Sequence, residues 1–181
     1  WAYRKEMVDT TSCRVVFGEA DGLPALVVDK FNDVIAIQTL SLGMDRWKKE
    51  IVQALREVTG VEKFYERNDV PIREKEGLPQ EKGFFSEPFD TNLTIEENGL
   101  KLMVDVAEGQ KTGHFLDQRL NHAAIAHIVK GKHVLDCFTH TGGFALHAAQ
   151  YGADKVEGLD ISGEAIRLAT ANAQLNKLEA V

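Results

Sequence analysis

Apolar and polar residues alternate along much of the first hundred positions, as they do in half-buried β-strands. The alternation predicts strands at residues 14–17, 25–30, 34–40 and 63–67. The stretch 84–106 predicts a hairpin, because Asn98-Gly99 is a strong signal for a two-residue turn between strands.

A helical spacing of apolar residues interrupts these strands once. Residues 46–58 place an apolar residue on every third or fourth position, with Asp45 as a candidate N-cap and Gly60 as the stop. Residues 1–12 also suggest a polar helix. Residues 68–83 contain two prolines and two glycines and suggest a surface loop. We therefore predict a compact α+β domain over residues 1–105, with strands around one helix.

The pattern changes after residue 105. A helix is predicted from Asp117 to a stop at Gly131, and then two strands alternate with two helices. The four elements are strand 133–137, helix 143–151, strand 155–159 and helix 163–176, the last with Ser162 as its N-cap. Alternating strands and helices predict a parallel sheet. Residues 106–181 are thus expected to form a second domain, and the fold class is α/β.

Composition excludes some kinds of protein. Of the 181 residues, 44% are hydrophobic and 27% charged, and no apolar run approaches the roughly 20 residues of a membrane span. Two cysteines form no disulfide framework, which favours the reducing cytoplasm. The net charge is -7, and residues 1–105 hold 14 Lys and Arg against 20 Asp and Glu. This is not the basic balance of many nucleic-acid-binding proteins. Oligomeric state is not predicted.

Candidate chemistry lies at the end of strand 133–137. Gly142 and Gly143 follow it, where ligands bind in open α/β sheets. The stretch lacks the G-x-G-x-x-G spacing of dinucleotide sites and the lysine of a P-loop. Asp136, at the strand end, would repel a pyrophosphate but suits an ammonium group. Asp160, 24 residues later, suits the hydroxyls of a ribose. S-adenosylmethionine, an adenosine that carries an amino acid and no phosphate, satisfies both demands.

Two stretches carry a resemblance to a known family. "VLDCFTHTGGFALHAA" with "VEGLDIS" resembles the first two motifs of class I S-adenosylmethionine-dependent methyltransferases, which have a Rossmann-like fold. "GQKTGHFLDQR", residues 109–119, is similar to the motif upstream of them in the ribosomal large-subunit RNA methyltransferase I family, which makes 5-methylcytosine in 23S rRNA. "NAQLNKL" also fits, and residues 1–105 look like that family's central domain. His114 and His140 depart from the residues usual there.

The resemblance implies a set of cofactor-binding residues and an RNA partner. Lys111, Phe115 and Gln118 would come from the upstream motif, Asp160 would hold the ribose, and Ile161 would touch the adenine. The methionine end would lie against five residues around the glycine turn: Asp136, Phe138, Thr139, Gly142 and Gly143. The implied RNA partner is 23S rRNA.

Structural alternatives exist for these residues. The glycines could serve only tight strand–helix packing, Asp136 could be an acid at a helix start, and Asp160 a helix N-cap. Lys111, Gln118 and Arg119 could be surface groups. His114 and His140 lack a third ligand, so we predict no metal site. Cys137 is expected to be a buried or pocket-wall thiol, not a nucleophile.

The two strands of residues 133–181 are fewer than the six or seven of a complete sheet of this class. The resemblance implies that a Pro-Pro turn and a catalytic cysteine follow later, and neither motif is in this sequence. The cysteine matters because its addition to carbon-6 of cytosine activates carbon-5. We therefore expect a truncated methyltransferase fold, with no catalytic residue in these 181 residues and no methyl transfer by them alone. Two alternatives stay open: a methyltransferase acting on another RNA, a protein or a small molecule, and a non-catalytic nucleotide- or RNA-binding module.

Overall fold

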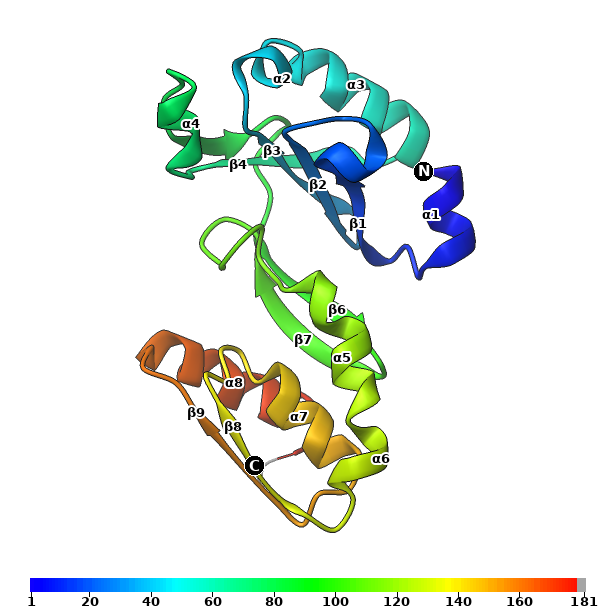
Figure 1. Cartoon of the computed structure of the whole chain (residues 1–181), viewed down its shortest axis with the longest axis vertical. Helices are drawn as coiled ribbons and strands as arrows, with labels where there is room; N and C mark the ends of the chain where they lie inside the picture. The colour runs from blue at the N-terminus through cyan, green and yellow to red at the C-terminus, as the bar shows by residue number, and fades with distance from the viewer. Residues whose placement is uncertain (179–181) are drawn as a thin grey trace. The chain divides into compact units, whose positions relative to one another are not determined.

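The computed structural model describes residues 1–178 and divides the chain into two compact units (Figure 1). The first unit comprises Trp1–Leu93 and Val104–Leu116, and the second comprises Thr94–Met103 and the chain from Asp117. The predicted division at residues 105 and 106 stays a prediction. The end of the chain, predicted inside or just after the last helix, lies outside the described residues.

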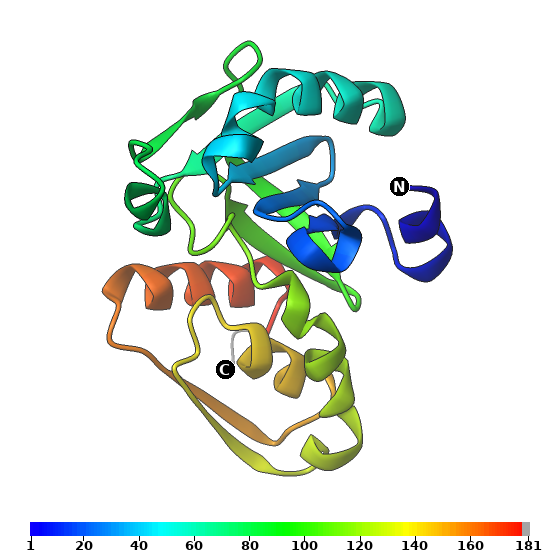
Figure 2. The same ribbon diagram turned by 45° about the horizontal axis from the view of Figure 1, so that its top comes forward.

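The first unit is built on a five-stranded sheet of order β1-β2-β3-β4-β5. Its elements are α1 (Ala2–Met7), β1 (Ser12–Phe17), η1 (Gly18–Asp21), β2 (Leu26–Phe31), β3 (Val34–Thr39), α2 (Leu42–Arg46), α3 (Lys48–Thr59), β4 (Lys63–Asn68), α4 (Ile72–Lys75) and β5 (Glu81–Phe84). Only β3 and β4 pair in parallel, as their helical crossover requires. Figures 1 and 2 show α2 and α3 on one face of this sheet.

The core of this unit forms where the predicted helix meets the sheet. Val52 and Leu55 of α3 pack with strand residues such as Ile35 and Phe64, which are fully buried. Gly60 ends α3 with a φ of +73°, a conformation that glycine adopts without strain. The sequence therefore predicted this helix and its stop correctly.

The predicted N-cap was wrong. The N-cap residue of α3 is Trp47, whose side chain makes no cap hydrogen bond, and Ser41 caps the preceding helix α2, since its hydroxyl accepts from the Met44 N–H at 3.3 Å. Asp45 lies inside α2, where its carboxylate accepts from the Thr39 hydroxyl and from Arg73, both at 2.8 Å. A buried arginine from a later segment recruits this acid, and local pattern gives no sign of such a partner.

The predicted loop at 68–83 was also wrong, because it contains α4 and β5. The Arg73 side chain is completely buried and bonds the Thr39 carbonyl, Asp45 and Glu81. These distant partners order a stretch that looks like a loop locally. At the other end of the unit, the helix predicted over 1–12 ends at Met7, and β1 begins at Ser12.

A hairpin follows, formed by β6 (Asn92–Glu97) and β7 (Leu100–Asp105). Its turn residues, Asn98 and Gly99, have φ values of +49° and +85°. Two successive left-handed residues match the twist of a two-residue hairpin. The predicted turn is confirmed.

The second unit contains the predicted parallel strand pair, β8 (His133–Cys137) and β9 (Lys155–Leu159). The helices α7 (Gly143–Gln150) and α8 (Gly163–Leu175) follow them, and Ser162 caps α8 by accepting from the Ala165 N–H. The helix predicted from Asp117 is divided into η2 (Leu116–Gln118), α5 (Arg119–Ala124) and α6 (Ala126–Val129).

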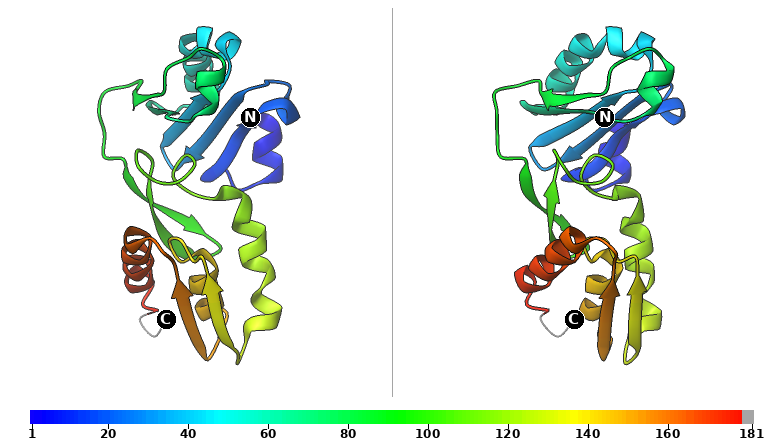
Figure 3. Two further views of the ribbon diagram at one scale, coloured as in Figure 1. Left: turned by 60° about the vertical axis from the view of Figure 1, so that its left-hand side comes forward. Right: turned by 90° about the vertical axis from the view of Figure 1, so that its left-hand side faces the viewer.

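Among residues 1–178, one face of the β8–β9 pair is covered within this unit. Val156 of β9 packs with Ala148 of α7, and Figure 3 shows α7 against the two adjacent strands. Leu135 and Leu159 alternate to the other face and are 62% and 60% exposed. The packing of α7 on the covered face therefore supports the ends of β8 and β9 and the turn after β8.

Candidate functional site

The candidate site is the turn that joins β8 to α7. In the parallel register, Asp136 lies opposite Gly158 and Cys137 opposite Leu159. The Thr139 N–H donates to the Leu159 carbonyl at 2.9 Å, which continues the pairing past the strand end. The two predicted acids therefore come from neighbouring strand ends.

Asp136 is half-buried and holds the start of α7. Its Oδ2 accepts from the Thr139 hydroxyl at 2.6 Å and from the Ala145 N–H at 3.0 Å. Gly142, the N-cap residue of α7, has no side chain that could accept this bond. Asp136 thus caps the helix from the strand, as the structural alternative proposed.

Asp160 holds the other side of the same turn. Its carboxylate accepts from the N–H groups of Ser162 and His140, each at 2.9 Å. These two backbone hydrogen bonds lower the pKa of Asp160 below its usual range, so the group is ionised at neutral pH. Asp136 contacts Thr139, and Asp160 contacts His140, the next residue in the chain. The two acids therefore hold the same short stretch of the turn.

That stretch carries backbone strain. Phe138 and His140 have φ values of +62° and +52°, a region that non-glycine residues adopt at a cost of about 1–3 kcal/mol each. The Phe138 side chain is 87% exposed, and Ile161, next to Asp160, is fully exposed. Strained residues and uncovered apolar side chains at a strand end are typical of a ligand site.

Packing alone accounts for both glycines. A Cβ on Gly142 would lie 3.1–3.3 Å from Leu146 and Ala169, and Gly142 has a φ of +91°. A Cβ on Gly143 would lie 2.7 Å from the His122 ring nitrogen Nε2. Both positions therefore require glycine with or without a ligand, and their role in cofactor binding stays a prediction.

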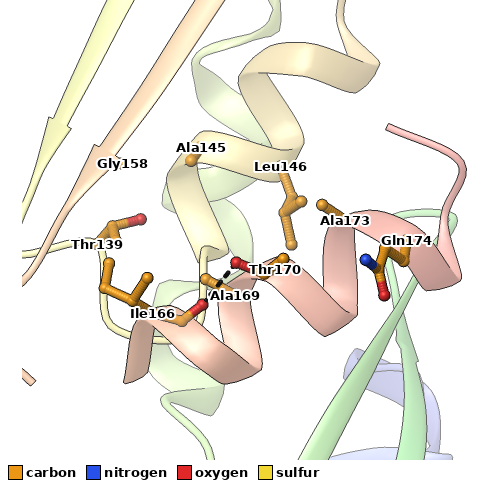
Figure 4. A pocket seen from close by; sticks show the side chains of 9 residues that line it. All are labelled: Thr139, Ala145, Leu146, Gly158, Ile166, Ala169, Thr170, Ala173 and Gln174. Carbon is orange, nitrogen blue, oxygen red and sulfur yellow. Dashed lines mark hydrogen bonds between the residues drawn. The ribbon is translucent and has the colours of Figure 1, made fainter. Parts of the chain in front are cut away.

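Two hollows adjoin the turn. One, of about 150 Å³, lies between β9, α7 and α8, and Figure 4 shows Thr139 and Ile166 at its rim. The other, of about 420 Å³, includes Asp136 and Phe144. Neither of these two hollows takes in both acids.

The upstream motif forms a tight loop in the first unit. Thr112 is fully buried and donates to the Asp29 carboxylate. Arg67 donates to the carbonyls of Val106 and Gly109, at 2.8 and 2.9 Å. The predicted residues Lys111 and Phe115 contact each other, with the ammonium 4.4 Å from the ring centre. Gln118 belongs to the second unit, where it accepts from Asn121 at 3.0 Å.

Sequence reasoning missed the role of Asn172, which is fully buried in α8. Its amide donates to the Thr141 carbonyl at 3.0 Å and accepts from the Met103 N–H at 2.7 Å. One turn later, Asn176 bonds both the N–H and the carbonyl of Lys101. The two asparagines at i and i+4 in "NAQLNKL" were a usable signal, since asparagine is uncommon inside helices.

Cys137 is exposed, so the prediction of a buried thiol was wrong, and the pocket-wall alternative stays a prediction. Strand alternation explains the error: Cys137 lies on the uncovered face with Leu135 and Leu159. Among residues 1–178, no helix combines the length and apolar character needed to span a membrane.

Comparisons with known proteins identify a family and named relatives that match most of the chain. The profile of a family described as S-adenosylmethionine-dependent methyltransferase matches residues 80–180. Proteins named ribosomal RNA large subunit methyltransferase I from Shewanella denitrificans and Shigella dysenteriae are 42% and 39% identical to the chain, over 93% and 99% of it. The chain spans 43% and 45% of the length of these two relatives.

Solved structures show the same fold. A SAM-dependent methyltransferase from Streptococcus mutans superposes with a TM-score of 0.82 at 25% identity, over 98% of this chain and 46% of that one. A methyltransferase in complex with SAH, S-adenosylhomocysteine, superposes with the same TM-score, identity and coverage. The prediction of a Rossmann-like methyltransferase fold is confirmed.

Proposed function

Because the chain belongs to the family of S-adenosylmethionine-dependent methyltransferases, we propose that the protein containing it methylates carbon-5 of a cytosine in 23S rRNA. The family depends on S-adenosylmethionine, so the predicted cofactor is confirmed at that level. The observation that carries the proposal is the strained turn between two acids at neighbouring parallel strand ends. The names of the relatives supply the substrate class.

The residues of the turn suit this cofactor. Asp160 is ionised, and each carboxylate oxygen that accepts one backbone bond keeps further acceptor capacity for ribose hydroxyls. The exposed side chains of Phe138 and Ile161 offer apolar contact. Thr139, Gly142 and Gly143 present main chain to the methionine end, and Asp136 holds them in place. Lys111, Phe115 and Gln118 complete the proposed set. When bound, the cofactor supplies an electrophilic methyl group on a sulfonium.

We assign no catalytic residue to the described part of this chain. Carbon-5 of cytosine needs a nucleophile that adds to carbon-6, and Cys137 lies at the end of β8, on the cofactor side of the proposed site. Both cysteines are free thiols, which supports a reducing compartment and hence the cytoplasm.

Replacement of Asp160 tests the cofactor site. In the full-length protein that contains this chain, Asp160→Ala should weaken S-adenosylhomocysteine binding by about 10–100-fold, because it removes a charged acceptor for the ribose hydroxyls. Isothermal titration calorimetry measures this affinity. Glu157→Ala is the matched control, since Glu157 is an exposed acid of β9 that pairs with Lys155. Unchanged affinity in Asp160→Ala would count against the site.

Loss of the gene tests the substrate. Mass analysis of ribosomal RNA from a deletion strain should show one 23S cytosine without its methyl group, and the gene restored on a plasmid should return it. A fully methylated 23S rRNA would refute the proposed substrate. In that event, the acidic balance of residues 1–105, with 14 Lys and Arg against 20 Asp and Glu, favours a substrate other than RNA.

A further inference from the structure

A cluster of three buried polar side chains lies beneath the glycine turn. Glu97, His122 and His147 are 2%, 3% and 0% exposed and come from β6, α5 and α7, which Figure 1 labels. His122 Nδ1 lies 2.6 Å from Glu97 Oε1, and the two imidazole rings stack at 4.8 Å between centres. Burial of such groups is unfavourable unless each has a partner, so their positions are closely defined.

The hydrogen bonds define the proton on His147. Its Nδ1 lies 2.7 Å from the Gly143 carbonyl, which can only accept, so Nδ1 carries the proton. Its Nε2 is then the acceptor for the Asn98 side-chain amide at 3.3 Å. Burial lowers the pKa of His147, in agreement with a neutral ring. Gly143, the first residue of α7, is thus tied to a ring one turn later.

His122 contacts the same residue. Because a Cβ on Gly143 would lie 2.7 Å from His122 Nε2, the imidazole lies directly against the bare backbone. The ring also packs edge-on against Phe144, at 4.5 Å between centres. Glu97 holds His122 through Nδ1 and so sets the orientation of the ring.

We propose that Glu97 and His122 are positioning residues that place the Gly142–Gly143 backbone for the amino-acid end of the cofactor. This inference rests on the proposed function. A buried pair of polar side chains generally stabilises a fold less than apolar residues of the same size would. The pair instead defines the position of one stretch of main chain. His147 and Asn172 add further hydrogen bonds to this stretch.

A bound cation is the rival explanation of the cluster. One ligand atom from each of the three residues lies within 4.8 Å of the others. A metal would need lone pairs on His122 Nδ1 and His147 Nε2. The first faces a carboxylate at hydrogen-bond distance, and the second faces an amide donor. Hydrogen bonds therefore explain the cluster without an ion.

The test compares two ligands in the full-length protein. S-adenosylhomocysteine has the amino-acid end, and 5′-methylthioadenosine lacks it, so a displaced turn should affect only the first. We expect His122→Ala to weaken S-adenosylhomocysteine binding at least tenfold and 5′-methylthioadenosine binding less than twofold. His122→Asn keeps a donor near the Nδ1 position and should stay within threefold of wild type for both. His127→Ala, at an exposed histidine of α6, is the control.

The Gly143→Ala variant covers the case in which His122→Ala does not fold, and where both variants fold a double-mutant cycle adds a second test. Gly143→Ala places its Cβ against the His122 ring and should give the same selective loss. In the double variant, the loss should be smaller than the product of the single losses, because the clash is gone. A direct clash with the ligand would not be relieved in this way.

Three results would overturn the proposal. Equal losses for both ligands would show a general structural role, and no loss for either would show no role. A stoichiometric metal ion in the purified protein, measured by plasma mass spectrometry, would make the cluster a metal site. If wild type binds neither ligand, the proposed cofactor site itself fails, which is a distinguishable outcome.

Discussion

At the scale of single residues, Asp136 and Asp160 each hold a different residue of one turn. Asp136 bonds the Thr139 hydroxyl, and Asp160 bonds the His140 N–H. Each acid therefore stabilises the strained backbone and also belongs to the proposed cofactor site. The structural and the functional interpretation of these acids are compatible, because a carboxylate oxygen can accept more than one hydrogen bond.

His147 gives a prediction for the pH dependence of stability. Burial lowers its pKa in the folded protein, so the unfolded chain binds a proton near its usual pKa of 6.5 while the folded one does not. Stability from this group is complete above pH 6.5 and decreases as the pH falls toward the folded pKa, by at most about 1.4 kcal/mol per pH unit. Urea unfolding from pH 8 to pH 5 should show a weaker decrease in His147→Gln.

The matched control for this measurement is His127→Gln, at an exposed histidine of α6. Identical slopes in wild type and His147→Gln would mean that His147 does not titrate differently on folding.

At the scale of elements, two asparagine side chains join α8 to β7. Asn176 bonds the N–H and the carbonyl of Lys101, as a neighbouring strand would, and Asn172 bonds the Met103 N–H. Asn172 also reaches Thr141 in the turn. The helix thus supports the hairpin and the candidate site through one row of amides.

Asn172→Ala should therefore destabilise the second unit. It leaves the Met103 N–H and the Thr141 carbonyl without these bonds, at a cost of about 1–3 kcal/mol for each group that stays unpaired. Chemical denaturation measures the loss. Gln174→Ala, at an exposed position of the same helix, should change the free energy of unfolding by less than about 0.5 kcal/mol. Equal losses in the free energy of unfolding from Asn172→Ala and Gln174→Ala would contradict this role of Asn172 in joining α8 to β7.

Local pattern predicted the elements whose signals are contained within them. The Asn98-Gly99 turn, the Gly60 stop, the Ser162 cap and the parallel pair β8–β9 all depend on neighbours in sequence or on simple alternation. Pattern failed at α4 and β5, where Arg73 is buried against Thr39 and Asp45, which are 34 and 28 residues away in sequence. The Glu97 cluster was missed for the same reason, since its members lie 25 or more residues apart.

At the scale of the whole molecule, charge and family give different indications. The net charge of -7 is not typical of an RNA-binding surface, whereas the relatives are named for ribosomal RNA. The chain spans 43% of the length of the first of these relatives, so its charge is compared with less than half of that relative. The two-acid turn was predicted from sequence because its residues are adjacent to strand ends, a position that α/β folds reserve for ligands.

The hydrogen bonds that anchor the upstream loop limit where this chain could be recombined with that of a relative. Asp29 accepts a hydrogen bond from Thr112, and Arg67 donates one to the carbonyl of Gly109. Asp29 and Arg67 belong to the sheet of the first unit, and their partners lie in the loop that leads to Lys111. A recombination point at residue 105 would separate this loop from the side chains that shape it. Substitutions at Asp29, Arg67 and Thr112 should therefore be inherited together, because the sheet of the first unit acts as a scaffold for this loop.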